Sequence, residues 1–184
     1  ISLLAAIQVE SMLGSLPANN AVLNNLHVRK VPSLPCRYGQ NWIWDDVEFY
    51  VWHPDENTLF QSTYNMKPNE MSCVLEIRNA STSFWLTGDV EKQGESAIVS
   101  RLSSEALQSI AEKHLVFMAP HHGSKTSSSV ELLKGLNPNL AFAQNAYKNR
   151  YGHPHPSVVA RYEDLNIPLL QTALTGAQIW IAHQ

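Results

Sequence analysis

Residues 115–143 read LVFMAPHHGSKTSSSVELLKGLNPNLAFA, so that two short apolar runs enclose a polar loop and an amphipathic segment. The runs at 115–119 and 140–143 have the length of buried strands. Ser128 and Glu131 have the spacing of a capping box and predict the start of a helix, which ends at the following Asn-Pro pair. The stretch therefore predicts a β-α-β unit.

The same alternation continues on both sides of this unit. The serines at 103–104 can cap a helix that precedes it, and residues 156–157 open a helix that follows it. The apolar runs at 169–172 and 179–182 predict two further strands.

The sequence pattern of the N-terminal half is typical of successive strands without helices between them. Residues 47–51 alternate at the strand period. The runs at 73–77 and 84–87, separated by a polar turn at 79–81, predict an antiparallel hairpin. Residues 32–41 are interrupted by Pro and Gly and predict a loop. Strands followed by alternating helices and strands predict an α/β fold in which helices cover a sheet.

Composition and length restrict the class of protein further. The 184 residues are 44% hydrophobic and 16% charged, which excludes a disordered tail and a coiled coil. No apolar run approaches the roughly 18 residues of a membrane-spanning helix, and the first residues lack the basic lead-in of a signal peptide. We therefore expect residues 1–184 to form a single domain without a membrane span.

The small net charge of −3 conceals an uneven distribution. Residues 1–112 hold 7 Lys and Arg against 13 Asp and Glu, whereas residues 113–184 hold 6 against 3 and most of the eight His. A mild basic bias beside His-rich loops fits a phosphorylated substrate, but nucleic-acid binders have a more concentrated basic footprint. Uneven solvation of the two halves explains the bias equally well.

Cys36 and Cys73 are the two cysteines of the chain, and two cysteines do not make a disulfide framework. We predict that both are buried free thiols. A single disulfide formed in an oxidising compartment is the alternative.

Polar clusters follow three of the predicted strands, and each has a structural alternative. The first cluster contains Asp89, which comes directly after Gly88. A carboxylate at a strand end, beside a glycine that lets a ligand approach the backbone, fits a metal ligand or a base. An ordinary turn is the alternative.

The second cluster is residues 120–124, PHHGS, followed by Lys125. Neighbouring side chains point apart, so we expect one of His121 and His122 to face a metal while the other takes a supporting role. Ser124 and the start of the next helix offer hydroxyl and amide donors suited to a phosphate. The alternative is a helix-capping loop with two solvated imidazoles.

The third cluster is residues 149–156, NRYGHPHP. We expect His153, which follows a glycine, to reach the strand ends, and we assign no role to His155. A rigid turn with exposed imidazoles is the alternative. The other histidines lack such surroundings and are interpreted as structural or exposed: His27, His53, His114 and His183.

Together the clusters place one Asp and two His-bearing loops after successive strands. Asp and imidazole are ligands of Zn²⁺ and Mn²⁺ in hydrolytic sites, which predicts a metal-dependent hydrolase. A Ser-His-Asp hydrolase is less well supported, because Ser124 does not lie in a Gly-x-Ser-x-Gly elbow. A cysteine nucleophile is less well supported still, because neither cysteine stands beside a His motif.

Nearly the whole chain resembles the C-terminal domain of ComEC-type DNA-internalisation competence proteins, which belongs to the metallo-β-lactamase-like hydrolases. The motifs that carry the resemblance are CRYGQNWIWD at 36–45, LTGD at 86–89, PHHGS at 120–124 and NRYGHP at 149–154. The resemblance implies a metallo-β-lactamase-like αββα sandwich, of which this chain holds the C-terminal portion. It also implies a nuclease that degrades the non-entering DNA strand during natural transformation.

The same resemblance implies site residues and partners. The residues carried over as metal ligands are Asp89, one of His121 and His122, and His153, which is a ligand or contacts the substrate, and Ser124 and Asn149 are carried over in supporting roles. Apart from the resemblance, Lys125 and the start of the next helix are catalytic candidates that can steady the negative charge of a phosphate. The expected partners are a Zn²⁺ or Mn²⁺ ion, DNA bound without sequence specificity, and an inner-membrane channel joined to the domain on its periplasmic side. The sequence identifies no aromatic platform for base stacking.

One motif of that family has no counterpart in the chain: His-x-Asp-x-Asp-His followed by Gly-Gly. In the family it lies just upstream of a helix that residues 1–7 resemble, so we expect an N-terminally truncated domain. A two-metal site needs ligands from both halves, and we therefore expect the isolated chain to be inactive. The alternatives are a metallo-hydrolase of another phosphodiester and a non-enzymatic domain that binds DNA or a partner.

Overall fold

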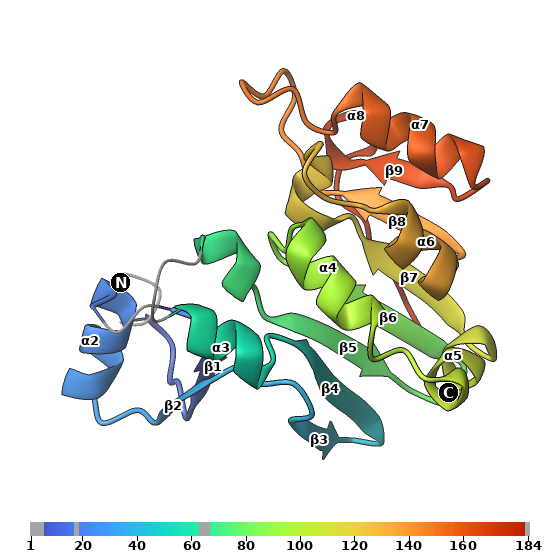
Figure 1. Cartoon of the computed structure of the whole chain (residues 1–184). Coiled ribbons are helices and arrows are strands. Elements are labelled where there is room, and N and C mark those ends of the chain that lie inside the picture. The colour runs from blue at the N-terminus through green and yellow to red at the C-terminus, as the bar shows by residue number, and fades with distance from the viewer. Residues whose placement is uncertain (1–5, 17–18, 63–66, 183–184) are drawn as a thin grey trace.

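The computed structural model describes residues 6–16, 19–62 and 67–182, without the side chains of 60–62. Its centre is a seven-stranded sheet in which strands adjacent in sequence are adjacent in space (Figure 1). The strands are β3 (Asn41–Trp44), β4 (Val47–His53), β5 (Val74–Arg78), β6 (Thr82–Leu86), β7 (His114–Met118), β8 (Leu140–Ala143) and β9 (Leu169–Gln171). Two sequence expectations fall outside the described residues. One is most of the helix expected at the chain start, because it includes residues 1–5, and the other is the structural or exposed role expected for His183.

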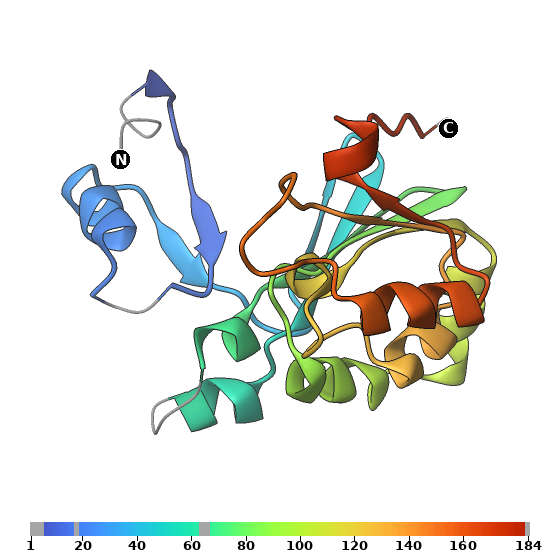
Figure 2. The same ribbon diagram turned by 90° about the horizontal axis from the view of Figure 1, so that it is seen from above.

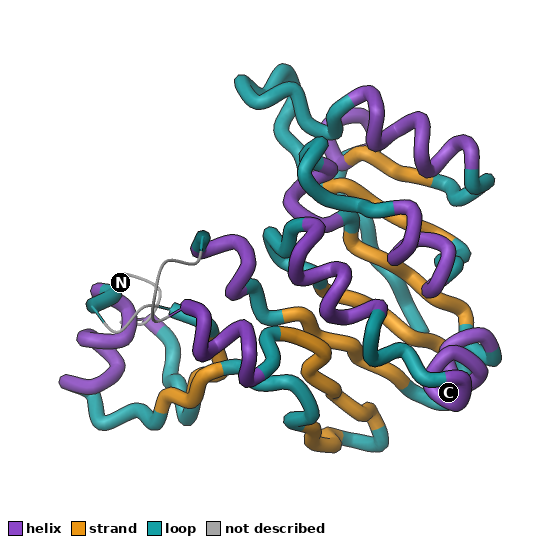
Figure 3. Tube along the Cα trace, viewed as in Figure 1, coloured by secondary structure: helices purple, strands orange, loops and turns teal. Residues whose placement is uncertain are grey.

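Helices connect most of these strands. The helices are α2 (Ala21–Val28), between β1 and β2, α3 (Glu56–Ser62), α4 (Lys92–Val99), α5 (Ser104–Ala111), α6 (Val130–Leu136), α7 (Pro156–Asp164) and α8 (Thr172–Thr175), which follows β9, with short 3-10 helices η1 (Pro68–Met71) and η2 (Pro120–Gly123). A separate parallel pair is formed by β1 (Met12–Gly14) and β2 (Ser33–Pro35). This pair and α2 lie to one side of the large sheet (Figures 1 and 3).

The predicted alternation of strands and helices is present. Strands β3 to β6 pair antiparallel, and β6 to β9 pair parallel. The predicted hairpin is β5 and β6, and its turn is held by Asn79, whose Oδ1 accepts from the amides of Ser81 and Thr82 at 3.0 and 2.8 Å. The predicted β-α-β unit is β7, α6 and β8.

Helices α4, α6 and α7 cover one face of the sheet (Figure 2). The core lies between them and the strands, and its largest fully buried side chains include Trp85, Phe117 and Tyr162. On the other face, Phe84 and Phe142 line a cavity of about 410 Å³ together with residues of the C-terminal segment 178–182. The described residues of the large sheet form one layer, and the two-sheet metallo-β-lactamase-like sandwich stays a prediction.

Several local predictions were wrong. Residues 179–182 form no strand. Ile179, Trp180 and Ala182 line the cavity, and Trp180 stacks on His114 at 5.0 Å. The expected loop at 32–41 contains β2. Helix α4 was not predicted, and its Gly94 fits closely, since a Cβ there would clash with Val90 Cγ2 and would lie 3.0 Å from the ring of His53.

Helix α6 begins one residue later than the capping box predicts. Ser129 is the N-cap, with its side chain accepting from the amide of Leu132, whereas Ser128 adopts a left-handed φ of 55°. The amides of Ser128 and Ser129 donate to the buried Glu95 of α4 at 2.5 and 2.7 Å. A carboxylate from a neighbouring helix therefore occupies the start of α6, which local sequence spacing cannot reveal.

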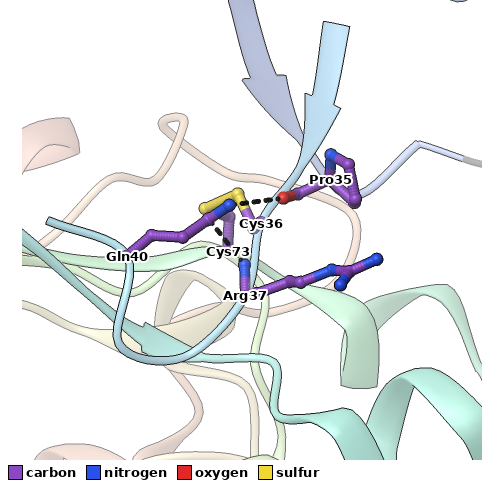
Figure 4. Close-up of a disulfide and its surroundings, with 5 residues drawn as sticks. All are labelled: Pro35, Cys36, Arg37, Gln40 and Cys73. Atoms are coloured by element: carbon purple, nitrogen blue, oxygen red, sulfur yellow. Dashed lines mark hydrogen bonds between the residues drawn. A yellow bond between two sulfur atoms is a disulfide. The ribbon is translucent and has the colours of Figure 1, made fainter.

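The two cysteines form a disulfide, so the prediction of free thiols was wrong (Figure 4). Cys36 follows β2 and Cys73 precedes β5, and their Cα atoms lie 5.7 Å apart. Gln40 holds the turn after Cys36 by donating to the carbonyl of Pro35 and accepting from the amide of Arg37. The bond thus ties the small parallel pair to the large sheet.

No helix among the described residues is long and apolar enough to cross a membrane.

Candidate functional site

Three loops meet where the parallel strands β6, β7 and β8 end. The carboxyl ends of neighbouring parallel strands share one edge of a sheet, and polar groups on the following loops gather there. The amide of His121 donates to the carbonyl of Gly88 at 2.9 Å, which joins the loops after β6 and β7. His122 Nδ1 lies 2.7 Å from the carbonyl of Gln144, which joins the loops after β7 and β8. The three predicted clusters therefore form one surface.

Asp89 is the carboxylate of this surface. Its Oδ1 lies 3.4 Å from His122 Nε2, and the two side chains are 44% and 48% exposed. Gly88 has a φ of 54°, which favours glycine, and the amide of Asp89 donates to the hydroxyl of Ser72 at 3.1 Å. Ser72 is next to the disulfide-bonded Cys73, so the bridge lies beside the segment that holds this loop.

His121 and His122 point to different partners, as expected for neighbours on a tight turn. Both adopt left-handed φ values, 48° and 56°. His121 Nδ1 lies 3.3 Å from Glu91 Oε1, and its Nε2 lies 3.4 Å from the side-chain nitrogen Nδ2 of Asn69. The site thus includes two side chains that the sequence analysis did not identify. Glu91 stands two residues after Asp89, a signal that was available, whereas Asn69 comes from η1 and is brought in by the fold alone.

His153 reaches the strand ends, as predicted. Its ring centroid lies 5.8 Å from that of His121, and its backbone is held by Asn149, which accepts from its amide at 2.9 Å and donates to its carbonyl at 2.6 Å. Partial burial, followed by the neighbouring imidazoles, lowers the pKa of His153, and Asp89 opposes that shift. Asn149 therefore holds the backbone of His153 in place, and its role in a functional site stays a prediction.

The predicted phosphate-binding donors are partly occupied. Ser124 is buried and its hydroxyl bonds that of Thr126 at 3.0 Å. The start of α6 is bonded to Glu95, so it offers no free amides at Ser128 and Ser129 to a ligand. Whether the remaining amides of this helix start steady a phosphate stays a prediction. Lys125 is exposed and lines a shallow cavity with Glu91 and Lys92.

The proposed metal ligands share an edge but do not converge. Asp89 faces His122, whereas His121 faces Glu91 and Asn69. In the part of the chain that the structure describes, no group of three or more His, Cys, Asp or Glu side chains is arranged to hold one ion. The arrangement of these side chains does not fit the ligand set of a metal site, and Zn²⁺ or Mn²⁺ binding stays a prediction.

The loop between β8 and α7, residues 144–155, projects beyond the strand ends (Figure 1, orange). Tyr147 and Tyr151 are 70% and 64% exposed. Lys148 Nζ lies 5.3 Å from the ring centroid of Tyr147, and Arg150 Cζ lies 4.7 Å from that of Tyr151. The sequence analysis identified no aromatic platform, although the alternation Tyr-Lys-Asn-Arg-Tyr was a visible signal for one.

Comparison with curated proteins finds competence and recombination proteins. The chain is 34% identical over 138 residues to competence protein ComA of Neisseria gonorrhoeae, covering 75% of the chain and 18% of that relative. It is 29% identical to recombination protein 2 of Haemophilus influenzae, covering 77% and 16%, and 30% identical to ComE operon protein 3 of Bacillus subtilis, covering 71% and 15%. The chain thus spans less than a fifth of the length of these relatives. No model of a known protein family matches it.

These comparisons correct two expectations. None of the three relatives carries the ComEC name, and none is named as a nuclease or a metallo-β-lactamase. The assignment to the ComEC type and the metal-dependent nuclease inferred through it are therefore replaced by a coarser result: the chain is similar to a segment of proteins named for competence or recombination.

Proposed function

We propose that the chain is a DNA-binding domain of a longer protein that takes part in DNA uptake. The observation that carries the proposal is the β8–α7 loop, which exposes Lys148 and Arg150 beside the imidazoles at the strand ends. Cations that pair with backbone phosphates supply most of sequence-independent DNA affinity. The names of two relatives, a competence protein and a recombination protein, support DNA as the partner.

The charges around the loop favour a phosphate chain at this edge. The C-terminal part of the chain, residues 113–184, holds 6 Lys and Arg against 3 Asp and Glu. Of the nearby carboxylates, Glu91 accepts from the hydroxyl of Thr126 at 3.1 Å, and Asp89 lies against His122. The cations of the loop have aromatic neighbours and no carboxylate partner among the ion pairs of the described residues.

The disulfide supports a place in an oxidising compartment. Structural disulfides form and persist outside the cytosol, in secreted proteins and the bacterial periplasm. We therefore propose that the domain works on the periplasmic or extracellular side of the cell, where incoming DNA is met before it crosses a membrane.

DNA binding by the chain, followed by fluorescence anisotropy, tests the proposal. We expect the double variant Lys148→Gln/Arg150→Gln to bind DNA more weakly and to lower the salt dependence of log Kd by about 2, one for each lost phosphate contact. The matched control is Lys30→Gln/Lys134→Gln, which removes the same charge from exposed positions elsewhere. Absence of DNA binding at low salt, or equal effects of the two double variants, would contradict the proposal.

A further inference from the structure

The β8–α7 loop consists of two consecutive turns that share Asn149. The amide of Asn149 donates to the carbonyl of Ala146 at 3.3 Å, and the amide of Gly152 donates to the carbonyl of Asn149 at 3.2 Å. The side chain of Asn149 bonds both ends of the loop, Ala146 at 3.2 Å and His153 at 2.6 Å. The backbone is therefore held in place before any ligand arrives.

Each turn presents the same pair of groups. The first turn carries Tyr147 with Lys148, and the second carries Arg150 with Tyr151. Arg150 also donates to the hydroxyl of Tyr151, and the ring of Tyr151 stacks on His153 at 5.8 Å. Both turns thus combine an exposed aromatic ring with a cation that lies over the ring.

We propose that these two turns are stacking platforms for the unpaired bases of single-stranded nucleic acid. An exposed ring can stack on the face of any base, and the adjacent cation can pair with the phosphate of the same nucleotide. In a duplex the base faces are covered by their neighbours in the stack, so the rings contribute little to duplex binding. Every base has an aromatic face, and the surface therefore selects single strands without selecting a sequence.

The inference rests on the proposed DNA binding and adds the strand class and the residues that select it. A lone exposed tyrosine is ordinary on a protein surface, and the exposure of one ring would not by itself support the inference. Two rings with cations, on a loop that its own side chains hold in place, are better explained by a repeating ligand such as consecutive nucleotides. Arg150 contributes a second planar surface, since guanidinium groups also stack on bases.

The test compares three oligomers of equal length: oligo-dT, an abasic deoxyribose-phosphate chain and a hairpin duplex. We expect Tyr147→Leu and Tyr151→Leu each to weaken oligo-dT binding about tenfold while binding of the abasic chain and the duplex stays unchanged. Tyr147→Phe and Tyr151→Phe, which keep the ring, are the matched controls and are expected to retain affinity. Circular dichroism of every variant confirms folding.

The outcomes separate the inference from the function on which it rests. If the Leu variants bind oligo-dT as tightly as the native chain, or lose affinity for the abasic chain to the same extent, the stacking inference is overturned. In that case the loss of duplex affinity in Lys148→Gln/Arg150→Gln would still support DNA binding. If the native chain binds none of the three oligomers, the proposed function fails together with the inference.

Discussion

His53 is a fully buried residue of β4 whose Nε2 lies 2.8 Å from the carbonyl of Glu70. Burial lowers its pKa. The unfolded chain therefore binds a proton below the ordinary histidine pKa of about 6.5, whereas the folded protein takes it up only at lower pH. Protonation of this one side chain thus favours unfolding as the pH falls.

We expect the free energy of unfolding to decrease between pH 7 and pH 5.5, by at most about 1.4 kcal/mol per pH unit from this residue. His53→Gln should reduce that slope, and the matched control His27→Gln, at an exposed position, should leave it unchanged. Urea unfolding at the two pH values measures both. Burial raises the pKa values of Glu70 and Glu95, which act in the opposite sense, so the difference between variants is the deciding quantity. Identical slopes for His53→Gln and the native chain would contradict the prediction.

At the scale of elements, α4 and α6 are joined by a carboxylate. Glu95 is fully buried and accepts from the amides of Ser128 and Ser129, which precede the first turn of α6. Arg161 of α7 donates to the carbonyls of the adjacent residues Ser127 and Ser128 at 2.8 and 3.0 Å. Three helices on the covered face of the sheet are therefore connected around one short segment.

Glu95→Ala should lower the free energy of unfolding by at least about 2 kcal/mol, because each buried amide left without a partner costs about 1–3 kcal/mol. The control Glu131→Ala removes an exposed carboxylate from the first turn of the same helix α6 and should cost a fraction of that amount. Urea denaturation followed by circular dichroism measures both variants. Equal, small losses would show that water replaces the carboxylate and that the network is not structural.

For the whole molecule, the disulfide connects the N-terminal pair β1–β2 to the large sheet. Cys36 and Cys73 are 37 positions apart, so the bond closes a long loop in the unfolded chain. The bond also lies next to a site loop, because Ser72 precedes Cys73 in the sequence and the Ser72 hydroxyl accepts a hydrogen bond from the amide of Asp89. We therefore expect the oxidised state to affect both the stability of the protein and the loop that carries Asp89.

Reduction with dithiothreitol should lower the free energy of unfolding by about 2–4 kcal/mol, as expected for a loop of this length. Cys36→Ser/Cys73→Ser should be equally destabilised and should not respond to the reductant. Urea unfolding with and without dithiothreitol measures the effect. Alkylation of two thiols in the native, unreduced protein would show that the bond is absent and would contradict the prediction.

The local elements could be predicted because their signals lie within a few residues. The hairpin β5–β6 and the β7-α6-β8 unit follow from apolar periodicity. The helix caps follow from residue type, because the side chain of Ser103 accepts a hydrogen bond from the amide of Ala106 and Asn137 adopts the left-handed conformation that ends α6. Helix α4 could not be predicted in this way. Its Gly94 disfavours a helix locally, and the residue is explained by the close approach of the Val90 side chain and the His53 ring.

The sequence alone was sufficient to indicate the strand-end loops of Asp89, His121, His122 and His153, because polar residues after apolar runs mark such loops in any α/β sheet. The tertiary structure decided which groups meet there. It pairs Asp89 with His122, directs His121 to Glu91 and Asn69, closes the start of α6 with Glu95, and joins Cys36 to Cys73. These contacts join positions up to 52 residues apart, and spacing along the chain carries no information about such pairs until the sheet has set its strand order.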